Sequence, residues 1–165
     1  MDERIIEALH QTYTAEAKAA LRLKVFAKKA DEEGFPQIAK LFRVIAFSEE
    51  VHAERALRVL RDIGSTEENL RESFESETGV AKVAYDGFLE LAYKLGEKPA
   101  AWHFTQSRDV EEGHSNLYKS ALNDMVSDRV TTYYVCSVCG YVSDGVLPDE
   151  CPVCGAKREK FVNLE

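Results

Sequence analysis

Two four-residue stretches decide how this chain is interpreted: Glu-Glu-Val-His at residues 49–52 and Glu-Glu-Gly-His at residues 111–114. Each contains the pattern Glu-x-x-His. On an α-helix, side chains three residues apart lie on one face, so each pair can bind a single metal ion. Because the pattern is short, it also arises by chance. A third copy, Glu7-x-x-His10, lies at the fraying start of the chain, and we interpret it as a chance occurrence.

Two further glutamates distinguish the other copies from chance. Glu16 precedes Glu49 by 33 residues, and Glu77 precedes Glu111 by 34 residues, so a triad of two glutamates and one histidine is repeated along the chain. In each triad, the first glutamate lies before a predicted turn and the other two ligands lie at a similar distance after it. We therefore expect the members of a triad to meet at one level of a helical hairpin. The candidate metal ligands, which are also the candidate catalytic residues, are Glu16, Glu49, His52, Glu77, Glu111 and His114.

Apolar residues recur at helical spacing through most of the chain. The pattern predicts four long helices, at residues 4–30, 36–62, 66–95 and 99–126. Helices of about 25 residues are about 38 Å long, and short turns between them favour an antiparallel bundle. The expected fold class is therefore an all-α four-helix bundle over residues 1–130, followed by a small metal-knuckle domain over residues 131–165.

Four carboxylates and two imidazoles in the middle of a bundle suit two metal ions. The carboxylates supply a charge of about −4, which two divalent cations cancel, and coordination positions remain open for a substrate. Without metal, four buried like charges would be very costly, and some would remain protonated. The whole chain has a formal net charge of −8 and no evident basic face. Binding to nucleic acid or to an anionic membrane is therefore not expected.

The four cysteines lie together near the C-terminus. Cys136, Cys139, Cys151 and Cys154 form two Cys-x-x-Cys-Gly turns, a spacing that predicts a tetrahedral four-sulfur metal site. Zinc and iron both accept four sulfur ligands, so the pattern leaves the metal open. The segment 131–165 is too short to bury a sufficient core, and the metal should hold it folded. The chain shows no secretory signal pattern and no apolar run of about 18 residues, so neither disulfides nor a membrane span is expected.

In this order, the two Glu/Glu-x-x-His triads and the two cysteine knuckles resemble those of the rubrerythrin family over essentially the whole chain. Residues 26–35 also resemble the first hairpin of that family. The resemblance implies a ferritin-like di-iron bundle followed by a rubredoxin-like domain. It further implies that the two triads hold two irons, with Glu49 and Glu111 as bridges, and that the four cysteines hold one iron, for which zinc can substitute.

The resemblance also implies an activity, the reduction of hydrogen peroxide to water in the cytoplasm as a defence against oxidative stress. Electrons would enter through the four-cysteine iron, from a donor such as rubredoxin or an NAD(P)H-dependent reductase. Val80 stands where the family usually has another glutamate, three residues after Glu77. This departure makes a ferroxidase or an oxygen-reducing di-iron oxidase an alternative, and a non-enzymatic iron- or zinc-binding protein is a third. Tyr85 is a further candidate catalytic residue, since its hydroxyl could hydrogen-bond a ligand or an oxygen intermediate.

The short connection between the second and third predicted helices predicts how chains assemble. Ferritin-like bundles join these helices by a long crossover, whereas only about three residues, 64–66, separate them here. The crossover would climb about 35 Å, and three residues reach only about 10 Å. We therefore expect a homodimer with exchanged hairpins, in which the first triad of one chain faces the second triad of its partner. A plain up-down-up-down bundle within one chain is the alternative.

Overall fold

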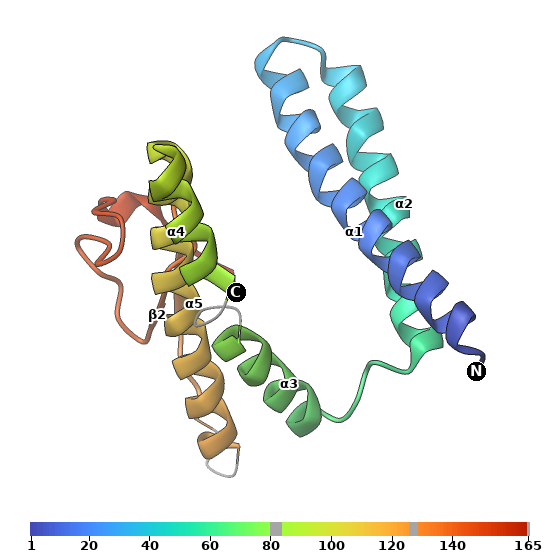
Figure 1. Cartoon of the computed structure of the whole chain (residues 1–165). Helices are drawn as coiled ribbons and strands as arrows, with labels where there is room; N and C mark the ends of the chain where they lie inside the picture. The colour runs from blue at the N-terminus through green and yellow to red at the C-terminus, as the bar shows by residue number, and fades with distance from the viewer. Residues whose placement is uncertain (80–83, 126–128, 165) are drawn as a thin grey trace. The chain divides into compact units, whose positions relative to one another are not determined.

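The computed structural model describes residues 1–79, 84–125 and 129–164. The chain divides into two compact units, Met1–Gly64 and Ser65–Glu165. The described residues form five α-helices and three short strands (Figure 1). The helices are α1 (Glu3–Glu32) and α2 (Pro36–Leu60) in the first unit, and α3 (Thr66–Gly79), α4 (Tyr85–Leu95) and α5 (Lys98–Asp124) in the second.

The first unit is an antiparallel helical hairpin, whose limits follow from local chemistry. The carboxylate of Asp2 caps α1 by accepting a hydrogen bond from the backbone N–H of Arg4 at 2.9 Å. Gly34 adopts a left-handed conformation with φ +80°, and Pro36 then occupies the first turn of α2. Arg61 has φ +63° and ends α2 at Leu60, two residues before the predicted limit.

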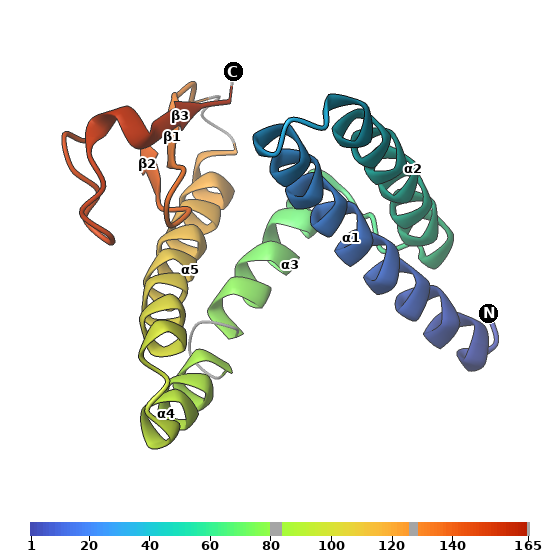
Figure 2. The same ribbon diagram turned by 90° about the horizontal axis from the view of Figure 1, so that it is seen from above.

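Alanine side chains form the contact between α1 and α2, which run side by side in Figures 1 and 2. Because alanine is small, the two helices can approach closely along this seam. The larger apolar side chains remain outside it: Phe47 is 67% exposed and Leu21 is 66% exposed. The hairpin therefore has a packed interior but leaves apolar surface uncovered. The buried residues of this alanine seam are Ala20, Ala27 and Ala30 on α1, with Ala39, Ala46, Ala53 and Ala56 on α2.

The helices of the second unit pack around α5. A reciprocal capping box starts α3, with the N–H of Ser65 donating to Glu68 Oε2 at 2.7 Å and the N–H of Glu68 donating to Ser65 Oγ at 3.3 Å. The hydroxyls of Thr78 and Ser115 hydrogen-bond each other at 2.9 Å, which joins α3 to α5. The predicted third helix, 66–95, is described as α3 and α4 on either side of residues 80–83, so Val80 lies outside the described residues.

The cysteine segment contains a three-stranded antiparallel sheet, with Cys136 at the end of one strand. Its strand order is β2 (Val142–Asp144), β1 (Tyr133–Cys136), β3 (Phe161–Asn163), and the short 3-10 helix η2 (Arg158–Lys160) precedes β3. Tyr141 and Phe161 form an edge-to-face aromatic pair beside this sheet, with ring centroids 6.4 Å apart. None of the helices in the described ranges is long and apolar enough to cross a membrane.

The alanine seam gives a stability prediction. Replacing Ala46, which is 1% exposed, with leucine should destabilise the hairpin by about 1–3 kcal/mol, because the added carbons have no space between α1 and α2. Chemical denaturation followed by circular dichroism would measure the change. The matched control is Lys40→Leu on the exposed side of α2, which should stay within about 0.5 kcal/mol of the unsubstituted protein. Equal effects of the two substitutions would contradict a close-packed seam.

Candidate metal centres

The first triad lies across the α1–α2 hairpin. Glu16 comes from α1, and Glu49 and His52 come from α2. One ligand atom from each of these three side chains lies within 4.8 Å of the others. His52 Nδ1 lies 3.3 Å from Glu49 Oε2. The structure thus brings Glu16 together with two potential ligands that lie more than 30 residues further along the chain.

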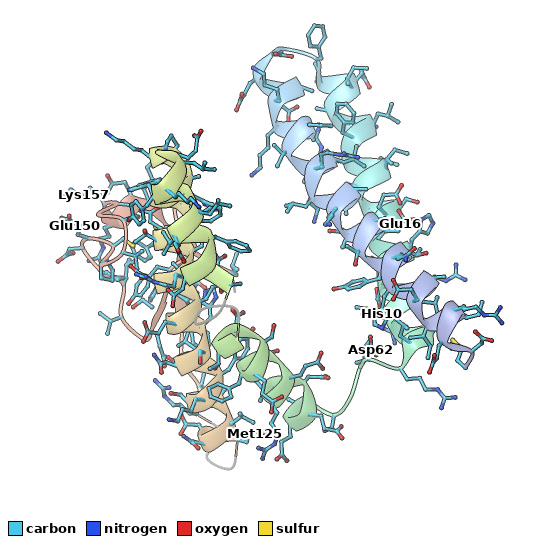
Figure 3. The ribbon with its side chains drawn as sticks, viewed as in Figure 1. His10, Glu16, Asp62, Met125, Glu150 and Lys157 are labelled. Atoms are coloured by element: carbon cyan, nitrogen blue, oxygen red, sulfur yellow. The ribbon has the colours of Figure 1, made fainter. Side chains whose placement is uncertain are left out.

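The two glutamates of this triad are close enough to share a proton. Their hydrogen bond raises the pKa of Glu16 and lowers the pKa of Glu49, and the nearby imidazole of His52 lowers the pKa of Glu49 further. Figure 3 shows Glu16 on α1, with His10 nearer to the N-terminus of the same helix. A bound cation would replace the shared proton and cancel the repulsion between the carboxylates.

The second triad repeats the first in the other unit. Glu77 comes from α3, Glu111 and His114 come from α5, and their ligand atoms also lie within 4.8 Å of one another. His114 Nδ1 lies 3.0 Å from Glu111 Oε2, and the His114 side chain is 27% exposed, compared with 51% for His52. Burial, together with the neighbouring Glu111, raises the pKa of Glu77 to about 7. This triad is the more enclosed of the two.

These donor sets fit a di-iron centre. Carboxylate oxygens and imidazole nitrogens are the ligands that non-haem iron takes in four-helix proteins. Each triad offers three side chains, and the two triads together offer the four glutamates and two histidines of that class of centre. The hydrogen bond with Glu49 raises the pKa of Glu16, and burial, with the neighbouring Glu111, raises the pKa of Glu77, so each triad disfavours full ionisation of its carboxyl groups.

The four cysteines fit a mononuclear site. Cys136 Sγ lies 3.7 Å from Cys154 Sγ, and Cys139 Sγ lies 3.6 Å from Cys151 Sγ. Sulfurs at the corners of a tetrahedron around a metal about 2.3 Å away would be about 3.8 Å apart. All four are free thiols, and burial raises the pKa of the Cys139 and Cys154 thiols. A metal ion therefore has to displace protons as it binds.

One contact joins the cysteine site to the second triad within Ser65–Glu165. Nε2 of His114 lies 3.4 Å from the backbone oxygen of Gly140, the residue after Cys139. Val110, which is 4% exposed, packs against the same glycine: a Cβ added to Gly140 would lie 3.8 Å from Val110 Cγ1. The sequence did not indicate this contact, because the acceptor is a backbone atom that any residue would offer.

A cavity opens beside His114 in the second unit. Its volume is about 370 Å³, and its walls are mainly apolar. Two tyrosines from different elements, Tyr118 of α5 and Tyr133 of β1, contribute to it, and the spacing of charged residues gave no signal for either. The complete lining is Leu70, His114, Leu117, Tyr118, Ala121, Tyr133 and Val142.

The remaining candidates are Tyr85 and the third Glu-x-x-His copy. Tyr85 belongs to an aromatic cluster, with its ring centroid 6.1 Å from that of Phe88 and 6.3 Å from that of Phe104. Among the described residues, the groups of metal-ligating atoms do not include Glu7 or His10. Glu7 instead accepts a hydrogen bond from Gln11 at 2.8 Å.

Helical hairpins with paired Glu/Glu-x-x-His triads, followed by a four-cysteine knuckle, define the class of ferritin-like di-iron proteins that carry a rubredoxin-like module. Family models agree with this class. The rubrerythrin model matches residues 7–122, and the model for the rubredoxin-like domain of rubrerythrin matches residues 134–162. The chain belongs to the rubrerythrin family, whose members are oxidoreductases, and the predicted fold class, di-iron site and four-cysteine site are confirmed.

Individual relatives cover most of the chain. It is 29% identical to rubrerythrin-2 of Clostridium acetobutylicum, over 93% of this chain and 92% of the relative. It is 31% identical to the rubrerythrin of Porphyromonas gingivalis, over 93% of this chain and 86% of the relative. The solved structure of nigerythrin in a partially reduced state is 26% identical, with a TM-score of 0.60 over 96% of this chain and 85% of the other.

The raised pKa of Glu77 predicts how the metal-free protein responds to pH. In the folded protein this pKa is about 7, against an ordinary value of 4.5. The folded state therefore binds the proton more tightly than the unfolded state, and the free energy of unfolding should fall as the pH rises from about 4.5 to about 7. Denaturant unfolding of chelator-treated protein across this range would measure the slope.

Two glutamine variants provide the comparison. Glu77→Gln removes the titrating group and should reduce the slope, whereas Glu75→Gln on the exposed side of α3 should preserve it. A slope unaffected by Glu77→Gln would show that another group causes the pH dependence.

Proposed function

We propose that the protein reduces hydrogen peroxide to water, with electrons delivered through the four-cysteine site. The observation that carries this proposal is the contact between His114 and Gly140, which joins the four-sulfur site to one carboxylate triad inside one compact unit. A purely structural metal knuckle has no need to adjoin a second metal site, whereas an electron donor does. When bound, the irons would supply the electrons and the Lewis acidity that cleavage of the O–O bond requires.

The residues divide into two ligand groups under this proposal. Glu49 and Glu111 would bridge the two irons, and Cys136, Cys139, Cys151 and Cys154 would hold the single iron. We place the boundary between the two domains at residues 130 and 131, between the segments that the two family models match. The terminal ligands of the two irons would be Glu16, His52, Glu77 and His114.

Side chains near the second triad suit a small polar oxidant. The cavity beside His114 is lined mainly by apolar groups, which limit the amount of bulk water near the metal ligands. Tyr118 and Tyr133 in that lining carry hydroxyls, which can donate hydrogen bonds to a peroxide oxygen. Tyr85 remains a further candidate for such a hydrogen bond. We place the reaction in the cytoplasm, where free thiols such as these four stay reduced.

A second function has support from one position of the sequence. In the family, the additional glutamate lets one iron exchange a histidine ligand for a carboxylate as its redox state changes. Val80 cannot ligate metal, so this exchange has no equivalent at this position. That difference favours oxygen reduction or ferroxidation over peroxide reduction. The electron donor under either function would be a rubredoxin or an NAD(P)H-dependent reductase, because the four-sulfur site accepts single electrons.

Oxidant preference can be measured directly. We expect anaerobically reduced protein, mixed with each oxidant in a stopped-flow instrument, to be reoxidised faster by peroxide than by oxygen. Faster reoxidation by oxygen would instead support the oxidase. A colourless protein that contains zinc but lacks ferric-thiolate absorption would support a non-enzymatic metal-binding protein.

A ligand substitution tests the proposed centre. Glu111→Gln should lower peroxide turnover by at least about 100-fold, because loss of a bridging carboxylate should cost more than loss of a supporting hydrogen bond. Glu112→Gln, one residue away on the exposed side of α5, should retain turnover and iron content. Similar turnover in the two variants would exclude Glu111 as a ligand.

We further propose that two chains exchange hairpins to complete each centre. The link between α2 and α3 consists of residues 61–65, which reach about 17 Å when fully extended. α2 contains 25 residues and is about 38 Å long. A crossover along a ferritin-like bundle therefore exceeds the reach of this link.

Exposed apolar residues support the same assembly. Ile38 and Ile45 lie on the face of α2 that carries Glu49 and His52, and they are 46% and 40% exposed. A centre that excludes water needs this face covered by apolar groups. Phe88, Leu91 and Leu95 of α4, spaced three and four residues apart and exposed in the second unit, offer a surface of the same character. The partner's second unit would cover the hairpin.

Mixing defective chains distinguishes exchange from a bundle within one chain. One variant combines Glu49→Gln with His52→Ala, and the other combines Glu111→Gln with His114→Ala. Each should be inactive alone. Co-refolded in equal amounts, they should recover about one quarter of the original turnover, because half of the dimers are mixed and each mixed dimer has one intact centre of two.

The control is to co-refold each variant with itself, which should recover nothing. No recovery in the mixed sample, with dimers present, would show that both triads of a centre belong to one chain.

A further inference from the structure

The contact between His114 and Gly140 connects two potential metal sites. Each of the two residues also makes a contact within its own site. On one side, the N–H of Gly140 donates to the carbonyl of Cys136 at 2.9 Å, in the turn that closes around the sulfurs. On the other side, Nδ1 of His114 lies 3.0 Å from Glu111. The carbonyl of Gly140 therefore moves with the cysteine knuckle, while the imidazole belongs to the carboxylate triad.

The two histidines differ in this respect although their triads match. His52 also points Nδ1 at a glutamate three residues earlier, at 3.3 Å. Within the described residues of Met1–Gly64, however, no group hydrogen-bonds Nε2 of His52, and its side chain is about twice as exposed as that of His114. Within Ser65–Glu165, the knuckle therefore supports the candidate ligand His114.

A neutral imidazole carries one proton, and the position of that proton decides which nitrogen can bind metal. If Nε2–H donates to the Gly140 carbonyl, the lone pair of Nδ1 faces Glu111 and Glu77, where a cation would lie. Hydrogen bonds of this kind commonly orient the histidines that bind metals, and their loss lowers metal affinity by about 10–100-fold.

We propose that the Gly140 carbonyl is a positioning group for His114, so that a metal in the four-cysteine site promotes cation binding at the second triad. The cysteine segment is too small to remain ordered on its own core, and its metal therefore fixes the carbonyl. Metal loading then has an order: the thiolates first, the His114 triad next and the His52 triad last. The inference concerns loading and does not depend on whether the completed centre reduces peroxide or oxygen.

The two knuckles of the protein offer a matched pair of variants. Gly140 and Gly155 both follow a Cys-x-x-Cys turn and both have positive φ, of +84° and +72°. A Cβ at Gly140 would approach Val110 of α5, whereas a Cβ at Gly155 would approach Glu150. Figure 3 shows Glu150 beside Lys157, with which it forms an ion pair at 2.7 Å. Both approaches are ordinary van der Waals contacts, at 3.8 Å and 3.4 Å, so Gly140→Ala and Gly155→Ala differ little in packing and introduce similar backbone strain at positive φ. Only Gly140, however, carries the carbonyl that His114 contacts.

The test uses the full chain and two metals of different preference. One equivalent of Zn²⁺ occupies the thiolates, and Mn²⁺, which prefers oxygen and imidazole ligands, is then titrated and followed by the electron paramagnetic resonance of the free ion. Zinc should tighten the first Mn²⁺ binding step by about tenfold in the original protein and in Gly155→Ala. It should have little effect in Gly140→Ala. Equal zinc effects in both variants, or no zinc effect in the original protein, would overturn the proposal.

Nitrogen NMR of the imidazoles supplies a readout that general destabilisation would not reproduce and that needs no variant. Without a cation in the triad, the Glu111 carboxylate at Nδ1 and the Gly140 carbonyl at Nε2 compete for the one proton of the neutral imidazole. At mildly alkaline pH, zinc in the four-cysteine site should raise the fraction of His114 with its proton on Nε2 and leave the signals of His52 in place. An unchanged His114 tautomer population on removal of the zinc would overturn the proposal even if the glycine variants fail to fold.

Discussion

Repulsion between closely placed carboxylates is the constraint on which the rest of this structure depends. In each compact unit, two helices bring two glutamates and a histidine within 4.8 Å. In the metal-free protein, a hydrogen bond between carboxyl groups raises the pKa of Glu16, and burial together with Glu111 raises the pKa of Glu77, so protonation relieves part of the repulsion. A bound cation would cancel more of the repulsion between the carboxylates than a proton does. The arrangement of the helices and the binding of metal therefore favour each other.

The helices supply the rigidity that such a site needs. The alanine seam holds α1 against α2, and the contact of Thr78 with Ser115 holds α3 against α5. Each hairpin therefore presents its three ligands on a stable backbone. Each hairpin carries three of the six candidate ligands, and each exposes apolar side chains.

Much of the site could be predicted because its chemistry is local in sequence. The Glu-x-x-His spacing places Glu49 with His52, and Glu111 with His114, on a single helix face, and the Cys-x-x-Cys turns bring sulfurs together in the same way. The contact between His114 and Gly140 could not be predicted, since it depends on how the knuckle packs against α5 and involves a backbone oxygen. The end of α2 was misplaced by two residues because Arg61 adopts a left-handed conformation that no residue-type preference indicates.

The composition of the seam would have a chemical consequence under the proposed reduction of peroxide. Methionine and cysteine are the side chains that hydrogen peroxide damages most readily, and the methyl group of alanine is inert to it. The chain has only two methionines, Met1 and Met125, both exposed and outside the α1–α2 contact. Repeated exposure to oxidant would therefore leave the interior of this hairpin chemically unchanged. The four cysteine thiolates would instead limit the lifetime of the protein.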